Sequence, residues 1–130
     1  MKHNILLVTL LTALLASTPL AVSAHGTAPA PTHGGIVAED SGDHWVELVT
    51  KGDQMTVFVS DGDNKPLPAS QLGGKATIVA GGKKEEVILM PAQANSLVGK
   101  LSAPISGKAT TLVAITVNGK PAQVRFVTSQ

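Results

Sequence analysis

Short runs of alternating apolar residues, separated by turn-forming residues, constrain this sequence more than any other feature. The segment TTLVAITVNGKPAQVRF, residues 110–126, alternates on both sides of Asn118-Gly119, a strong signal for a two-residue hairpin turn. Similar runs predict strands near 36–39, 44–50, 55–60, 75–80, 85–90, 97–102, 110–117 and 121–127. No segment shows a helical period. The sequence therefore predicts an all-β fold.

Three hairpins can be aligned so that apolar residues face apolar residues across the strands. The predicted pairs are Leu48 with Val57, Val46 with Val59, Ile78 with Val87, Ala76 with Leu89, Ile115 with Ala122, and Val113 with Val124. Pro121 cannot donate to a strand ladder, so we expect it near an edge or at the start of its strand. Seven or eight antiparallel strands in about 95 residues favour a single immunoglobulin-like or Greek-key β-sandwich over residues 35–130.

The first 24 residues have the pattern of a secretory signal peptide. A basic start, MKHN, precedes an uncharged apolar run, ILLVTLLTALLA, and a small-residue exit, STPLAVSA. We expect cleavage after Ala24, so that the mature chain begins at His25 and does not stay inserted in a membrane. The chain has no cysteine, and export without disulfides favours a bacterial periplasm. Residues 25–34 are rich in Pro, Ala, Gly and Thr, and we expect a flexible arm.

Charge argues against two classes of partner. Cleavage would remove Lys2, the only charged residue of the leader, so the ten Lys/Arg become nine against nine Asp/Glu. A neutral chain has no excess positive field for nucleic acid or for an anionic membrane surface. The sequence also has no nucleophile elbow, zinc-protease motif, phosphate loop or dinucleotide fingerprint, so we do not expect an enzyme.

The histidines are the main candidates for chemistry, because imidazole is a common ligand of Zn(II) and Cu(II). After cleavage, the α-amino group and ring Nδ1 of His25 could chelate one metal ion. His33 stands before two glycines at the junction of arm and domain, and His44 stands at a strand end. The extrapolated hairpin register puts Asp61 opposite His44, where its carboxylate could orient the ring. A mobile arm could then bring the three histidines together.

Each of these histidines also has an interpretation that involves no metal ion. His25 could be the first residue of a disordered arm, His33 an exposed loop residue, and His44 half of a structural His–Asp pair. The spacing of the three histidines matches no closed-site signature. The same hairpin argument assigns Met55 to the core. It places Met90 opposite Lys75 and away from the core, where a role toward a soft metal ion stays open.

The succession HGGIVAE, HWVELV, VFVSDGDNKPLPA, GKATIVAGGKKEEVIL, PAQANSLVGK and QVRF resembles a known group of proteins. These are small periplasmic proteins, and N-terminal extensions, associated with heavy-metal efflux adaptors of the cobalt–zinc–cadmium and copper–silver type. The resemblance covers about residues 35–128. It implies an accessory module that binds or passes on transition-metal ions, with His33 as the natural ligand. The chain lacks the adaptors' helical-hairpin, lipoyl and barrel regions. Copper carriers of the CopC type, which also begin with His on a β-sandwich, offer an analogy.

The sequence therefore predicts a periplasmic accessory protein of a heavy-metal efflux system that binds Cu(II) or Zn(II) reversibly. The predicted metal site comprises His25, His33 and His44, with Asp61 in support and Met90 as a further candidate. The alternative is a metal-free interaction module that docks on an efflux adaptor or another envelope protein through a sheet edge.

Overall fold

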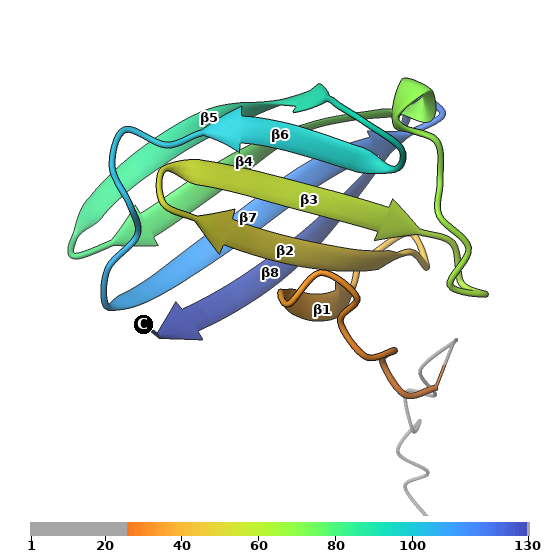
Figure 1. The fold of residues 1–130 in the computed structure, drawn as a ribbon, viewed down its shortest axis with the longest axis horizontal. Coiled ribbons are helices and arrows are strands. Elements are labelled where there is room, and N and C mark those ends of the chain that lie inside the picture. The colour runs from red at the N-terminus through yellow and green to blue at the C-terminus, as the bar shows by residue number, and fades with distance from the viewer. Residues whose placement is uncertain (1–25, 130) are drawn as a thin grey trace, which may run out of the picture.

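Eight antiparallel strands make up the fold (Figure 1). The structure is a computed structural model and describes residues 26–129. The strands are β1 (Ile36–Glu39), β2 (Trp45–Lys51), β3 (Gln54–Ser60), β4 (Leu72–Ala80), β5 (Lys83–Pro91), β6 (Ser96–Lys100), β7 (Lys108–Val117) and β8 (Lys120–Ser129), with one 3-10 turn, η1 (Ala69–Gln71), before β4. Every strand predicted from the sequence is present, which confirms the all-β class.

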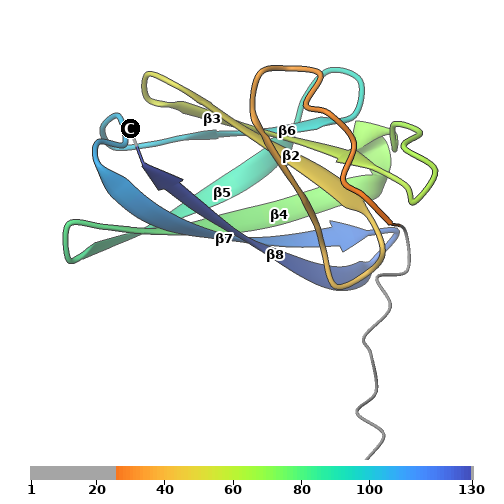
Figure 2. The same cartoon turned by 90° about the horizontal axis from the view of Figure 1, so that it is seen from below.

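The strands form one sheet in the order β1-β2-β3-β6-β5-β4-β7-β8. Strand β5 pairs with β4 and, at its end, with β6, and this joins the two layers seen from below in Figure 2. The sheet curls until its outermost strands, β1 and β8, approach each other, and it is nearly closed into a barrel. Two separate sheets in an immunoglobulin-like sandwich are therefore not confirmed.

Side chains that alternate along the strands fill the interior. In β7 and β8 buried and exposed residues follow each other with the two-residue period expected of half-buried strands. The predicted pairs Leu48–Val57, Val46–Val59, Ile115–Ala122 and Val113–Val124 are all present. Met55 is fully buried, as predicted, and Pro121 lies in the terminal strand β8.

The predicted β4–β5 register is wrong by two residues. Ala76 faces Val87 and Gly74 faces Leu89, because the hairpin turns over Gly81-Gly82 alone rather than over a four-residue loop. Both glycines have positive φ, 56° and 75°, which suits the two-residue turn that matches the twist of the strands. A shift of two keeps every side chain on its predicted face. It also puts Ile88 rather than Met90 opposite Lys75.

Two predictions about the N-terminal region fall on residues that are not described. The signal peptide, residues 1–24, and His25 lie outside the described residues. Among residues 26–129, the structure has no helix with the length and apolar character needed to cross a membrane.

Candidate functional site

The segment Thr32-His33-Gly34-Gly35 folds around the carboxylate of Glu47. Gly34 adopts a positive φ of 77°, a conformation that favours glycine. A Cβ at Gly35 would collide with the carbonyl oxygen of Leu48 on β2. The two glycines therefore let the chain turn and then lie directly against β2, which explains why the sequence reads HGG at this point.

Glu47 accepts hydrogen bonds from three of the four residues of this turn. The backbone N–H groups of His33, Gly35 and Thr32 donate to its carboxylate at 2.8, 3.0 and 3.2 Å. The Thr32 hydroxyl and His33 Nδ1 lie 3.2 and 2.9 Å from its Oε2 atom. Burial raises the pKa of Glu47, but the hydrogen bonds from the His33 ring and the backbone outweigh it and lower the pKa to about 2. Glu47 is therefore a buried, ionised anchor for the arm.

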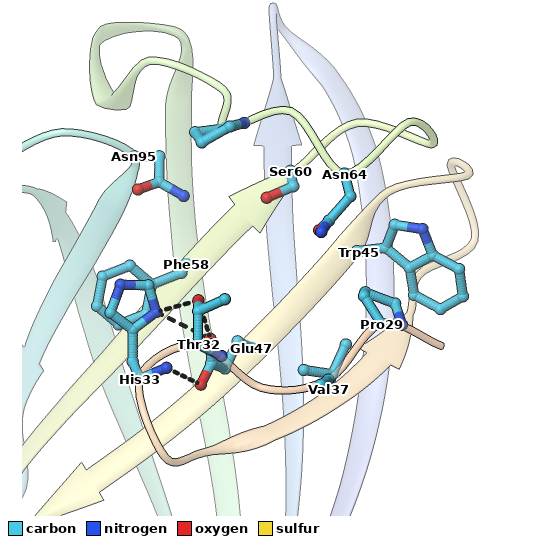
Figure 3. A pocket seen from close by; sticks show the side chains of 12 residues that line it. Pro29, Thr32, His33, Val37, Trp45, Glu47, Phe58, Ser60, Asn64 and Asn95 are labelled. Carbon is cyan, nitrogen blue, oxygen red and sulfur yellow. Dashed lines mark hydrogen bonds and ion pairs between the residues drawn. The ribbon is translucent and has the colours of Figure 1, made fainter. Parts of the chain in front are cut away.

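The ring of His33 is fixed from two sides. It stacks on Phe58 of β3 with ring centroids 3.6 Å apart and planes 1° from parallel. Its Nδ1 lies within hydrogen-bond distance of Glu47 and Thr32 Oγ1 (Figure 3). Because a carboxylate only accepts, Nδ1 carries a proton, and in the neutral ring Nε2 keeps its lone pair. Within residues 26–129 no hydrogen bond reaches this Nε2.

A pocket of about 200 Å³ opens beside this histidine. Pro29 and Ala30 of the arm line it, together with the aromatic rings of Trp45 and Phe58. Asn64 and Asn95 add amide groups to the rim (Figure 3). The pocket thus combines aromatic walls, neutral amide groups that can accept or donate hydrogen bonds, and an imidazole backed by a carboxylate.

His44 shows the same arrangement at a second place. Its Nδ1 lies 2.9 Å from Oδ2 of Asp40, whose side chain is fully buried. The same carboxylate accepts hydrogen bonds from the backbone N–H groups of Gly42 and His44, at 2.8 and 2.9 Å. The ring sits in a shallow hollow beside the β7–β8 turn, with Asn118 and Lys120.

The carboxylate predicted to orient His44 was Asp61, and in the structure it is Asp40. Strands β2 and β3 end at Trp45 and Ser60, so the ladder stops before it reaches His44 and Asp61. Asp61 instead accepts hydrogen bonds from the backbone N–H groups of Asp63 and Lys65, at 3.0 and 2.8 Å, within its own turn. Local closure of the β1–β2 turn brings Asp40, four residues away, to His44.

His33 and His44 do not converge. His33 lies over Glu47, whereas His44 has the opposite parity along β2 and lies against the β7–β8 end. Among the described residues, no group of three or more His, Cys, Asp or Glu side chains is placed to hold a metal ion. Met90 is 61% exposed on β5, opposite Val98, and lines neither histidine's pocket. His25, the third histidine of the predicted metal site, lies outside the described residues.

Sequence reasoning missed Glu47, Asp40 and Phe58. Glu47 is a single charged residue inside the apolar run HWVELV, and nothing in that run marks it as a partner of the arm. The only signal for its role was the HGG motif, which requires the arm to lie close to a strand. No family model, curated protein or solved structure matches the chain at a significant level.

Proposed function

We propose that this chain binds a transition-metal ion, Cu(II) or Zn(II), through Nε2 of His33. The observation that carries the proposal is the Glu47–His33 pair, with Nδ1 held on a buried carboxylate and Nε2 directed away from it. Histidines that bind metals commonly donate their other ring nitrogen in this way, which fixes the tautomer and raises the basicity of the ligand nitrogen.

The surroundings of His33 reduce the cost of binding. The stack on Phe58 and the hydrogen bonds of the arm already restrict the ring, so less conformational entropy is lost when Nε2 binds a metal ion. The ionised carboxylate of Glu47 adds negative charge beside Nδ1 of the ring, which favours a cation at Nε2. The side chain of His33 is 41% exposed, so an ion can enter and leave. Reversible binding and transfer suit such a site.

We propose His25 as the second source of ligands. Pro29 and Ala30 line the pocket of His33, and His25 is four residues before Pro29. Four residues of extended chain span at most roughly 13–14 Å, a reach that would allow the α-amino group and ring of His25 to join the same ion. Cleavage after Ala24 would create that amino group, so the complete site would exist only in the exported protein.

The biological setting follows from the leader-like N-terminus and the resemblance to efflux-associated proteins. We propose that the protein acts in the periplasm as an accessory of a heavy-metal efflux system and exchanges its ion with an adaptor protein. No catalytic step is part of this proposal.

The test is a titration of Zn(II) and Cu(II) into the mature protein, residues 25–130, at pH 7. Zn(II) binding is followed by NMR of the histidine rings, and Cu(II) binding by its visible absorbance and electron paramagnetic resonance spectrum. We expect the ring signals of His33 to move at micromolar Zn(II), and His33→Ala to remove the response. The matched variant His44→Ala should keep it. If His33→Ala binds both ions as tightly as the parent, the proposal fails.

A second pair of variants tests the role of the buried carboxylate. Glu47→Gln should weaken metal binding by about 10- to 100-fold, because the amide orients His33 less well and carries no charge. Asp40→Asn makes the same change beneath His44 and should leave the affinity unchanged. If Glu47→Gln and Asp40→Asn lose metal affinity equally, neither carboxylate acts specifically through the His33 site.

The contribution of His25 is tested by adding one glycine before it. The extension moves the free amino group away from the His25 ring, so the affinity for Cu(II) should fall while the His33 ring still responds to Zn(II). An unchanged affinity for Cu(II) would remove His25 from the site and leave His33 in place.

A metal-free interaction module is the second candidate. The observation that favours it is the open margin of the sheet at β8, where backbone groups have no partner strand. If the protein binds neither Cu(II) nor Zn(II) but binds a polypeptide at this margin, the result would support this candidate instead.

A further inference from the structure

The sheet, over the described residues, does not close between its two outermost strands, β8 and β1. Strand β8 pairs with β7 along all ten of its residues and has no strand paired to its other side. Its Gln123 faces outward at this margin, because its N–H and C=O groups bond Ser41 rather than β7. By the two-residue period, the backbone groups of Arg125 and Val127 face the same way.

The outward-facing backbone groups of Arg125 and Val127, unlike those of Gln123, have no partner in residues 26–129. No backbone hydrogen bond outside the β7 ladder reaches Arg125 or Val127. Pro121 has the same parity, so its missing N–H falls on this free edge and leaves the β7 ladder intact. The β8 edge therefore offers donors and acceptors at the spacing that only another extended chain matches.

A groove of about 310 Å³ accompanies the edge. It is bounded by residues 34–36 and 48–50 on one side and by residues 127–129 on the other. Ile36 and Val127 are 44% and 54% exposed there, although both are large apolar residues. The buried hydroxyl of Thr128, which lines the groove, has no hydrogen-bond partner. Figure 1 shows the C-terminal part of β8 at the margin of the sheet.

The charges around the groove select the occupant. Arg125 lies on the edge strand, Lys108 pairs with Ser129, and Lys51 follows the lining residue Thr50. All three are exposed, and none of them forms a salt bridge within the described part of the chain. No acidic residue lines the groove. A nucleic acid or a lipid headgroup would satisfy the charge but not the row of backbone groups.

We propose that the β8 edge binds an extended, acidic segment of a partner protein by strand addition. The segment pairs with the outward backbone groups of Arg125 and Val127. Its alternate side chains on the core-facing side are apolar and cover Ile36, and the side chains between them are carboxylates that lie on the outer face with Arg125, Lys108 and Lys51. The interaction does not depend on metal at His33, so each proposal can fail without the other.

The first measurement uses the mature protein alone. Amide hydrogen exchange should be fast at Arg125 and Val127 and slow at Val124 and Phe126, which bond β7. Slow exchange at all four positions would mean that the edge is already paired, and this result would overturn the proposal.

The second measurement adds a probe, the capped peptide EVEVTVE, with KVKVTVK as its charge-reversed control. We expect the acidic peptide to bind at least about tenfold more tightly and to slow exchange at Arg125 and Val127. Val127→Pro removes one outward N–H, as Pro121 already does, and should abolish binding. Val127→Thr keeps that N–H and should bind.

Three further outcomes would overturn the proposal. They are equal binding of the two peptides, unchanged binding by a folded Val127→Pro variant, and a concentration-dependent dimer that protects Val127 without peptide. The last result, seen by analytical ultracentrifugation, would assign the edge to a second copy of this chain. The NMR spectrum of Val127→Pro should keep the signals of the parent's core residues. Unchanged core signals would show that a loss of peptide binding is not caused by unfolding.

Discussion

At the scale of single residues, a buried carboxylate determines how the N-terminal arm lies on the sheet. Glu47 organises a turn of four residues through five hydrogen bonds, and Asp40 closes the β1–β2 turn onto His44. In each case backbone N–H groups and an imidazole share one carboxylate. Over residues 26–129 this arrangement leaves Nε2 of each histidine without a hydrogen bond, and it makes the carboxylates important for stability.

The pKa of Glu47 predicts a pH dependence of stability. The pKa is lowered from 4.5 to about 2 on folding, so the folded state favours the ionised form. The stabilisation is fully present above pH 4.5 and is lost as the pH falls toward 2, with an upper bound of roughly 3 kcal/mol. Urea unfolding at pH 6 and pH 3 should show a larger loss for the parent than for Glu47→Gln. Equal losses would contradict this role.

The two glycines of the HGG motif should respond differently to substitution. Gly35→Ala places a Cβ against the backbone of β2 and should lower the free energy of unfolding by about 2 kcal/mol or more while releasing the arm. The Cβ added by Gly34→Ala contacts no other atom, so this substitution should lower the free energy of unfolding by only about 1 kcal/mol, the cost of a positive φ at alanine. Thermal unfolding compares the two, and an equal cost would mean that close approach at Gly35 is unimportant.

At the scale of elements, the turns rather than the strands decide the register. Asn118-Gly119 gives the β7–β8 hairpin its predicted pairing, and Gly81-Gly82 gives β4–β5 a tighter turn than the apolar pattern indicated. Apolar matching alone accepts a shift of two residues, because such a shift leaves each side chain on the same face. The turn geometry removes that ambiguity.

The β4–β5 turn can be tested by changing it. Replacing Gly81 with Asn gives Asn-Gly, which suits two consecutive positive φ values and should stabilise the protein by a few tenths to about 1 kcal/mol. Gly81→Val introduces a branched side chain at positive φ and should destabilise it by about 1–2 kcal/mol. Unfolding in urea distinguishes these outcomes. If both variants lose stability equally, the turn is not the two-residue type.

At the scale of the whole molecule, one curled sheet encloses one core. The buried side chains come from strands near both ends of the strand order, including Val46 on β2 and Phe126 on β8. The same curling leaves the β8 edge at the surface and separates the two histidines. The core and the two proposed binding surfaces thus follow from a single arrangement of strands.

Met55 is buried in the core and Met90 lies on the surface, so substitutions at these two positions test which side chains the curled sheet buries. Met55→Ala should cost about 2–5 kcal/mol, because it leaves a cavity in the core. Met90→Ala, at 61% exposure, should cost less than about 0.5 kcal/mol. Calorimetry of both variants tests the prediction, and a large loss at Met90 would mean that its surface is covered in solution.

The sequence by itself determined the all-β class, the position of every strand, the core role of Met55 and the edge position of Pro121. These depend on local alternation and on turn residues, and both can be read along the chain. The candidate histidines could also be named from the sequence, although their partners could not.

Only the tertiary structure decided that Glu47 and Phe58 hold His33, that Asp40 holds His44, and that the two histidines lie apart. Hydrogen bonds to a carboxylate depend on where the arm crosses β2, and no periodic pattern in the sequence encodes that crossing. The open β8 edge likewise follows from the order in which the strands pair. Strand order depends on packing between segments far apart in the chain, whereas alternation records only which side of each strand is buried.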